Sequence, residues 1–204
     1  MREDRIKEIQ RDTTETKIRI KVNLDGKGVY NVTTPNGFFT HMLELLSKHS
    51  GIDMEIKVEG DTQVDLHHTV EDTGIVLGEA LGEALGDKKG IERYASIMMV
   101  MDKVRCDVAL DLGGRSNLVF YMPALMFESA FEDFDYQLVE EFMKAFSDGL
   151  KATLHISDPY AAGKDPTSGN KHHLAEAVFK GLARVLKQAV KITGEDIPST
   201  KGTI

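Results

Sequence analysis

Two motifs of the form His-His-x-x-Glu carry the clearest chemistry in the chain. The first runs from His67 to Glu71 and the second from His172 to Glu176. Each motif opens an apolar run with helical spacing, so we expect both at helix N-termini. Adjacent helix residues point about 100° apart, whereas residues three or four positions apart share a face. Each glutamate can therefore work beside one of its histidines while the other points elsewhere, and the two motifs predict two shared sites.

Metal binding is the chemistry that this residue set favours. A single such motif would more often be a chance histidine pair beside a glutamate that the helix dipole favours. Two of them, each opening a helix in its own half of the chain, indicate ligands. Imidazoles mixed with carboxylates, without thiolates, suit Zn, Mn, Fe or Ni, and six-coordinate Mn(II) fits at least as well as Zn. The predicted ligands within the motifs are His67, His68, Glu71, His172, His173 and Glu176.

The first half of the chain has the pattern strand, strand, helix, strand, helix. Alternation of apolar and polar residues predicts a strand over 16–24, and the turn Asp25-Gly26 predicts that 28–34 pairs back on it as a hairpin. The remaining elements are a helix over 38–49, a strand over 53–59 and the helix of the first motif, which closes near Gly86.

The same order restarts after a joint at residues 90–94. One long strand is predicted over 96–112, with its partner over 117–122 after the Gly113-Gly114 turn, then a helix over 136–150, a strand over 153–156 and the helix of the second motif. This repetition predicts an internal duplication. We expect an α/β (α+β) sandwich of two ββαβα halves in a single domain over 1–204, with half-repeats at about 10–90 and 91–195 and a tail at 196–204.

The repeat also gives a role to the middle helix of each half. His41 lies early in that helix in the first half, and the equivalent place in the second half falls at Glu141. By residue type alone His155 is the better ligand, but its position does not correspond to that of His41. We therefore predict His41 and Glu141 as metal ligands and His155 as a strand histidine in the core or just behind the ligands.

A local group of basic and hydroxyl side chains could bind a phosphate. Arg115 follows two glycines that let backbone approach a ligand closely, and the tail combines hydroxyl and ammonium donors. Each residue alone is more often a solvated surface group, so the set carries the prediction. Its members are Arg93, Arg115, Lys180, Ser199, Thr200 and Lys201, and Glu15 adds a carboxylate just before the first strand.

Composition excludes several other classes of protein. At 204 residues with 41% hydrophobic content the chain can bury a substantial core, and a formal net charge of -8 argues against nucleic-acid binding. We expect no membrane span, because no apolar run approaches the ~20 residues that one needs. The single cysteine, Cys106, allows no intrachain disulfide; we expect it buried in a strand, and a reducing cytoplasm as the compartment.

Taken together, these residues resemble one family. The chain is similar nearly end to end to the imidazoleglycerol-phosphate dehydratases of histidine biosynthesis, and its two His-His-x-x-Glu motifs, combined with the tail from Pro198 to Gly202, are highly specific to that family. The other matching segments are 11–16, 41–43, 85–91, 101–102, 111–115 and 154–156.

The resemblance implies a duplicated fold like the second domain of ribosomal protein S5, two Mn(2+) ions per active site, and a homo-oligomer of 24 subunits with sites at subunit interfaces. It implies metal ligands at the six motif positions and at His41, with Glu141 standing where many members have histidine. It also implies that the substrate phosphate meets Arg93, Arg115, Lys180, Ser199 and Lys201.

The implied reaction removes water from D-erythro-imidazole-glycerol phosphate and gives imidazole-acetol phosphate. The resemblance implies that the two metals hold the ring as imidazolate, which helps expel the C3 hydroxyl, and that a carboxylate then removes the C2 proton. We expect Glu15 or Glu176 to be that base. A di-metal hydrolase, or a protein that metal assembles without catalysis, would use similar motifs, and an assay with this substrate separates the three.

Some positions depart from the family pattern. Thr40 and Leu66 stand where an acid usually precedes a ligating histidine, and Leu45 stands where plant members often have glutamine. Acids at the first two places could orient imidazoles, so metal affinity is expected to differ. The segment over 157–169 is longer than usual.

Overall fold

The duplicated sandwich is visible in the order of elements. The computed structural model describes residues 5–126, 133–161 and 170–204. The first half contains β1 (Ile6–Asp12), β2 (Thr16–Asn23), β3 (Tyr30–Thr33), α1 (Gly37–Ser50), β4 (Asp53–Gly60) and α2 (His67–Leu85). The second contains β5 (Tyr94–Met101), β6 (Val104–Asp111), β7 (Asn117–Tyr121), the short 3-10 turn η1 (Pro123–Met126), α3 (Leu138–Leu150), β8 (Thr153–Ser157) and α4 (Lys171–Ala189).

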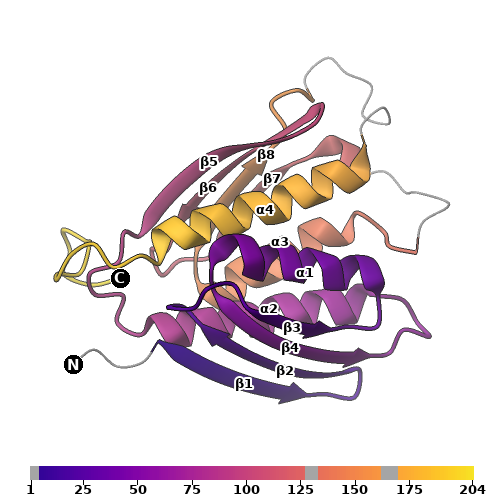
Figure 1. The fold of residues 1–204 in the computed structure, drawn as a ribbon, viewed down its shortest axis with the longest axis horizontal. Coiled ribbons are helices and arrows are strands. Elements are labelled where there is room, and N and C mark those ends of the chain that lie inside the picture. The colour runs from indigo at the N-terminus through magenta and orange to yellow at the C-terminus, as the bar shows by residue number, and fades with distance from the viewer. Residues whose placement is uncertain (1–4, 127–132, 162–169) are drawn as a thin grey trace.

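The two sheets have the same topology. Among the described residues, each sheet has four strands, in the orders β1-β2-β4-β3 and β5-β6-β8-β7. The first three strands in each order pair antiparallel, and the fourth pairs parallel with the third. The helices lie between the two sheets, so that each sheet keeps one face outside (Figure 1). The predicted duplicated α/β sandwich is therefore confirmed.

Each half begins with one strand that the sequence pattern did not reveal. β1 falls in the segment expected to be a polar start. It is an edge strand whose residues are alternately exposed and half-buried, so its sequence carries no strong hydrophobic pattern. The predicted long strand over 96–112 is two strands, β5 and β6, which the two-residue turn Asp102-Lys103 separates. That turn lacks the glycine that usually marks such hairpins, and Asp102 adopts a positive φ of 50° itself.

The predicted pairing of the third strand in each half is wrong. β3 does not pair back on β2; it runs parallel to β4, with Val32 opposite Ile56. β7 likewise runs parallel to β8. The reason is that β2 and β6 already have partners on both edges, and parallel strands need a long crossover, which α1 and α3 provide. The long segment noted over 157–169 lies largely outside the described residues.

The helices form two corresponding pairs. α2 packs on α3 and α1 packs on α4. In the first pair the backbones touch: a Cβ atom added at Gly74 would lie 2.8 Å from Phe142 O, and one at Gly78 would lie 2.5 Å from Phe146 O. Contacts that advance along both helices together mean that α2 and α3 run parallel, with their N-termini at one end.

Local hydrogen bonds place both histidine motifs at helix N-termini, as predicted. α4 has Asn170 as N-cap, whose side chain accepts the His173 N–H at 3.0 Å. α2 has no side-chain cap bond at Leu66, and the Asp65 carboxylate instead accepts the His67 N–H at 2.7 Å. Both motifs therefore begin a helix next to an anchored backbone.

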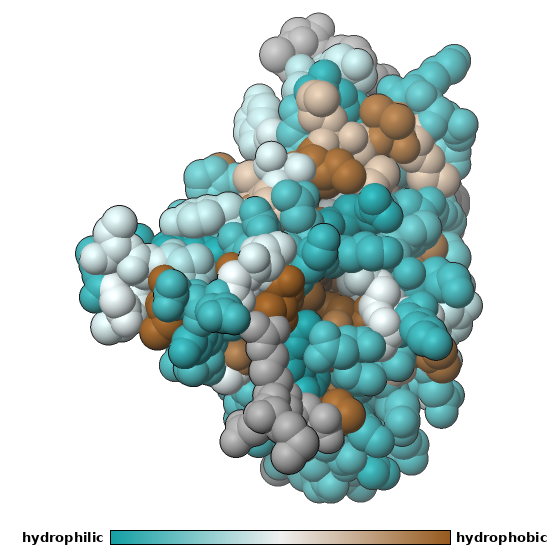
Figure 2. Space-filling view, turned by 60° about the vertical axis from the view of Figure 1, so that its left-hand side comes forward, coloured by the Kyte–Doolittle hydropathy of each residue, from teal (hydrophilic) through white to brown (hydrophobic). Residues whose placement is uncertain are grey.

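The outer faces of the two sheets differ in character. The first sheet presents charged residues outward, with cross-strand pairs such as Arg19–Glu8 and Lys21–Glu55. The second presents apolar and aromatic side chains that are 46% to 68% exposed (Figure 2, where hydrophobic colour gathers on the upper side). Those residues are Tyr94, Met98, Val100, Val119 and Tyr121. These side chains are therefore left uncovered by the rest of the chain that the structure describes.

The prediction that the single cysteine is buried in a strand holds. Cys106 is buried in β6, and burial raises the pKa of its thiol to about 12, so the thiol is unreactive. Within the helices that the structure describes, none has the length and apolar character needed to cross a membrane.

Candidate active site

The second motif joins the middle helix of the first half. His172 Nε2 lies 2.9 Å from Glu176 Oε1, four residues along α4. His41 on α1 brings its own Nε2 to 3.8 Å from the same oxygen. Lys180, one turn further along α4, donates to Glu176 Oε2 at 2.6 Å. His41, His172 and Glu176 thus lie close together, with an ammonium beside them.

Glu176 is held as a carboxylate. Burial raises the pKa of Glu176, but the hydrogen bond and charge of Lys180, followed by those of His172, outweigh burial, so the pKa is lowered. Both carboxylate oxygens already have partners. Glu176 is therefore suited to accept and hold cationic or metal partners more than to take up a proton.

The first motif lies beside the β1–β2 turn. His67 Nε2 is 3.6 Å from Glu71 Oε2, again four residues apart on one helix. His68 Nε2 faces the Glu15 carboxylate at 3.9 Å, and its Nδ1 lies 3.0 Å from Asp61 Oδ2. The Asp61 hydrogen bond raises the pKa of His68, and the charge of Glu15 adds to it. The group combines two imidazoles with three carboxylates.

A carboxylate from a turn also orients the remaining motif histidine. Asp102, in the β5–β6 turn, places Oδ2 3.2 Å from His173 Nδ1. His68 and His173 hold equivalent places in their motifs, and each has Nδ1 beside an aspartate. In each case Nδ1 is the nitrogen beside the aspartate, so Nε2 is the nitrogen left available to another partner, as in imidazoles that bind a metal with a carboxylate behind them.

The predicted anion binders gather in one cavity, with one exception. A cavity of about 700 Å3 is lined by eleven residues of β5, the Gly113-Gly114 turn and the tail. Arg93 is fixed in its wall by Asp111 at 2.7 Å and by donation to Pro198 O at 2.8 Å. Lys180 is absent from this lining and belongs to the Glu176 group. The predicted residues that do line the cavity are Arg93, Arg115, Ser199, Thr200 and Lys201.

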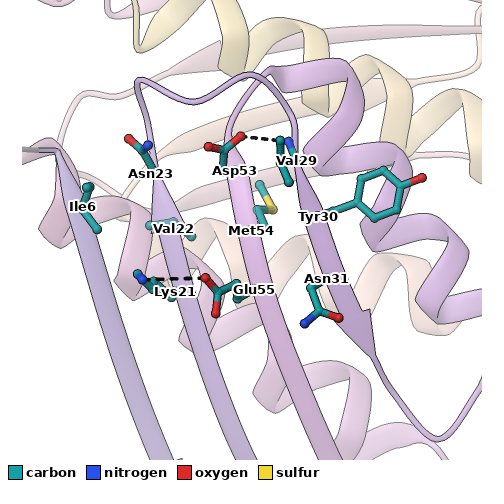
Figure 3. A pocket seen from close by; sticks show the side chains of 10 residues that line it. All are labelled: Ile6, Lys21, Val22, Asn23, Val29, Tyr30, Asn31, Asp53, Met54 and Glu55. Carbon is teal, nitrogen blue, oxygen red and sulfur yellow. Dashed lines mark hydrogen bonds and ion pairs between the residues drawn. The ribbon is translucent and has the colours of Figure 1, made fainter.

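The other cavities are formed by different residues. One of about 430 Å3 lies on the first sheet, with Lys21 paired to Glu55 and Asp53 bonded to the Val29 backbone at its rim (Figure 3). Its lining contains none of the predicted site residues. A smaller one of about 240 Å3 includes Glu15 and Asp61 and so adjoins the first motif.

Glu141 and His155 were the two candidates for the residue equivalent to His41, and the structure places them differently. Glu141 occupies the place in α3 that His41 occupies in α1, relative to the helix C-caps Lys151 and Gly51. Its ligand role stays a prediction. His155 lies in β8 as expected but is exposed, so its predicted place in the core is wrong. The reason is the two-residue period of a strand: Leu154 and Ile156 point inward, and His155 must point outward.

Within residues 5–126, 133–161 and 170–204, no group of three or more His, Cys, Asp or Glu side chains is arranged to hold a metal ion. The groups described above bring imidazoles and carboxylates near one another without forming such an arrangement.

Sequence reasoning missed Asp61 and Asp102 as partners of the histidines. The positions expected for orienting acids are those directly before His41 and His67, which are Thr40 and Leu66. Thr40 instead bonds Thr34 at 2.9 Å, and Leu66 packs on the core. The Met101-Asp102 segment was noted, but the turn that brings it to α4 was not recognised.

Comparison with known proteins identifies the family. Residues 34–186 match the family model of imidazoleglycerol-phosphate dehydratase. The chain belongs to the imidazoleglycerol-phosphate dehydratase family. It is 47% identical over 197 residues to the family member from Nautilia profundicola, covering 97% of this chain and 99% of that one. It is 44% identical over 198 residues to the member from Oceanobacillus iheyensis, covering 96% and 97%.

Solved dehydratase structures share the fold. The crystal structure from Staphylococcus aureus superposes with a TM-score of 0.75 at 34% identity and covers 93% of this chain and 99% of its own. The Pyrococcus furiosus structure, in complex with (S)-C348, gives 0.76 at 33% identity and covers 96% and 100%. As a family member the chain is a hydro-lyase of histidine biosynthesis.

Proposed function

We propose that the chain dehydrates D-erythro-imidazole-glycerol phosphate to imidazole-acetol phosphate, with two Mn(2+) ions per active site and sites completed between subunits. The observation that supports this most is the combination of two histidine–glutamate groups with a separate cationic cavity. The groups suit an imidazole-binding metal centre, and the cavity suits the phosphate at the other end of the substrate.

The donor set fits the metal. Imidazoles and carboxylates are available in both groups, and Cys106, the only thiol, is buried away from them. Asp61 and Asp102 fix the rings of His68 and His173. When bound, the two ions would supply Lewis acidity that stabilises the substrate ring as imidazolate. The proposed ligands are His41, His67, His68, Glu71, Glu141, His172, His173 and Glu176.

The chain's own residues would bind and orient the phosphate end. Arg115 and Lys201 face the same cavity from the glycine turn and the tail. The backbone near Gly114 can approach a ligand closely, because its φ of 76° is accessible to glycine. Arg93, already paired with Asp111, would supply the remaining donors of its guanidinium.

Of the two candidate bases, the geometry supports Glu15. Its carboxylate is half exposed and lies 3.9 Å from His68 Nε2. Glu176 has both oxygens engaged and a lowered pKa, which weakens it as a base. In the proposed reaction Glu15 takes the C2 proton, the C3 hydroxyl leaves as water, and the enol that remains tautomerises to the ketone.

Two features support assembly into a homo-oligomer, for which we propose 24 subunits. Among the residues that the structure describes, no side-chain group is complete as a metal site, and the second sheet exposes an apolar outer face. If metal links subunits, removing it with EDTA should convert the assembly into smaller oligomers, seen by sedimentation velocity. An unchanged profile in EDTA would count against metal-linked contacts.

A turnover assay tests the function directly. Metal-stripped protein would be reloaded with Mn(2+) and given imidazole-glycerol phosphate, and formation of the ketone would be followed together with free phosphate. Ketone without free phosphate is expected. Release of phosphate would indicate a hydrolase, and neither product from protein that assembles with Mn(2+) would indicate a purely structural metal role.

A further inference from the structure

Asp72, the residue that follows the first His-His-x-x-Glu motif, ties two strands to α2. It is 8% exposed. Arg11, near the end of β1, forms an ion pair with its Oδ1 at 2.5 Å. Thr16, the first residue of β2, donates its hydroxyl to Oδ2 at 2.5 Å and is itself 2% exposed. One buried carboxylate therefore holds both ends of the turn that joins β1 to β2.

The turn between these two anchors carries Glu15. Thr13 braces it: the Thr13 hydroxyl accepts the Glu15 N–H at 3.2 Å and the Thr16 N–H at 2.9 Å, and Thr13 N–H donates to Thr16 O at 2.8 Å. With the backbone fixed in this way, only the Glu15 side chain extends, and its carboxylate reaches 3.9 Å from His68 Nε2.

The anchor and the histidine lie on one face of α2. His68 and Asp72 are four residues apart, so Asp72 lies one helical turn below the imidazole that Glu15 faces. The backbone position of Glu15 relative to His68 is thus set through the helix, the Asp72 carboxylate, and its contacts with Arg11 and Thr16.

The other half of the fold has no such anchor at the corresponding place. There the glutamate of the motif is followed by Ala177, which is fully buried and apolar. The β5–β6 turn reaches its helix through the exposed Asp102, whose side chain is 72% accessible. A buried acid at position 72 is therefore not a requirement of the duplicated fold itself.

We propose that Asp72 is a positioning residue that holds the β1–β2 turn so that Glu15 lies at working distance from the substrate ring. This rests on the proposed function, in which Glu15 is the base. Loss of the anchor lets the turn move. Displacing a reacting group by about 1 Å costs up to about 100-fold in rate.

A double-mutant cycle separates positioning from a general structural role. Asp72→Ala should lower kcat by about 10- to 100-fold with little change in KM, and Asp72→Asn, which keeps an acceptor for Thr16, should fall between. In a Glu15→Gln background, Asp72→Ala should cause less than about a twofold further loss, because residues that act as a unit are not additive. Equal losses in both backgrounds would overturn the proposal.

Hydrogen exchange of the backbone gives a readout that does not depend on turnover. Asp72→Asn and Arg11→Met should both speed amide exchange over residues 12–17 and leave α3 unchanged, while Arg11→Lys should restore protection in part. Glu8→Gln, which removes an exposed pair on the same hairpin, is the matched control and should change neither exchange nor kcat. Unchanged exchange over residues 12–17 in folded Asp72 variants would refute the anchor. If the variants exchange faster but the wild type shows no turnover, only the proposed reaction is refuted.

Discussion

The two halves of the molecule share a backbone plan but differ in what their side chains do. The correspondence is close: Ser47 donates to Ile52 O at 2.7 Å, and Ser147 donates to Ala152 O at 2.6 Å at the same place in the other half. The first half has a charged outer sheet face and a buried acid that anchors a turn. The second has an apolar outer face and lines the cationic cavity. The two halves thus share these serine-to-carbonyl hydrogen bonds, whereas the side chains of their outer faces and turns differ.

The strongest test of this comparison changes the carboxylate of each hairpin turn. Glu15→Gln should lower kcat by about 10²- to 10⁴-fold, because it removes the proposed base. Asp102→Asn should cost about 10-fold, because it weakens a bond that orients His173. Steady-state kinetics of both variants with Mn(2+) supplied in excess would measure the difference, and equal losses would show that the two turns have the same role.

A second test concerns the two outer sheet faces. Val100→Lys on β5 should prevent assembly of the large oligomer, because it places a charge in the exposed apolar face of the second sheet. Asn31→Lys, an exposed position on β3 of the first sheet, should leave assembly intact. Sedimentation velocity with Mn(2+) present would measure the oligomer size of both variants. If the Val100→Lys variant still forms the large oligomer, another surface forms the contact.

The cationic cavity that we propose for the phosphate is lined by the second half and the tail, and its lysine can be removed alone. Lys201→Ala should weaken binding of substrate about 10-fold through KM, with a smaller change in kcat, since it removes one charged contact to the phosphate. Lys57→Ala on the first sheet is a control with the same loss of charge. If a phosphate-bearing analogue binds Lys201→Ala as tightly as the wild type, the cavity is not the phosphate site.

The smallest effect compares equivalent loop anchors at the starts of β4 and β8. Asp53 accepts the N–H groups of Lys27 and Val29, each at 2.8 Å, whereas Thr153 makes a single bond to Arg115 O at 3.2 Å. Asp53→Ala should lower the free energy of unfolding by about 1–3 kcal/mol, and Thr153→Ala by about 0.5 kcal/mol or less. Urea denaturation measures both.

The Asp53 effect should depend on pH. Burial raises the pKa of Asp53, but the backbone donors around it outweigh burial and lower the pKa below 3.8. A lowered pKa means that the stabilisation is fully present above that ordinary value and is lost as the pH falls through the folded pKa. The difference between wild type and Asp53→Ala should therefore shrink in acid, and a constant difference would contradict this origin.

The sequence predicted the helices and histidine motifs well because strong local signals mark them. Helical periodicity and the motif positions predicted α2 and α4. The repeat predicted that Glu141 holds the place in α3 that His41 holds in α1. The prediction of strand pairing failed because pairing depends on partners that are distant in the chain. Without β1, one edge of β2 is left unpaired in the predicted sheet, and residues 28–34 were assigned to it. Residue type correctly grouped the basic and hydroxyl side chains that line the cavity, except for Lys180. Lys180 lies four residues after Glu176 on α4 and donates to its carboxylate instead.

The partners of the imidazoles could not be predicted from neighbouring positions. Asp61 follows β4 and Asp102 closes a hairpin, so each reaches its histidine only through the folded path of the chain. His155 could have been placed correctly, because its two neighbours are apolar and strand alternation turns it outward.

The contact of α2 with α3 sets a limit on how the site can change. Because Gly74 and Gly78 bring main chain against main chain, the two helices already stand at their minimum separation. Side-chain substitutions around them can widen the gap between their N-terminal ends but cannot narrow it. A Cβ at position 78 would lie 2.5 Å from Phe146 O and 2.7 Å from Leu150 N, so replacing Gly78 with alanine would force apart this helix pair, in which main chain meets main chain across the two halves.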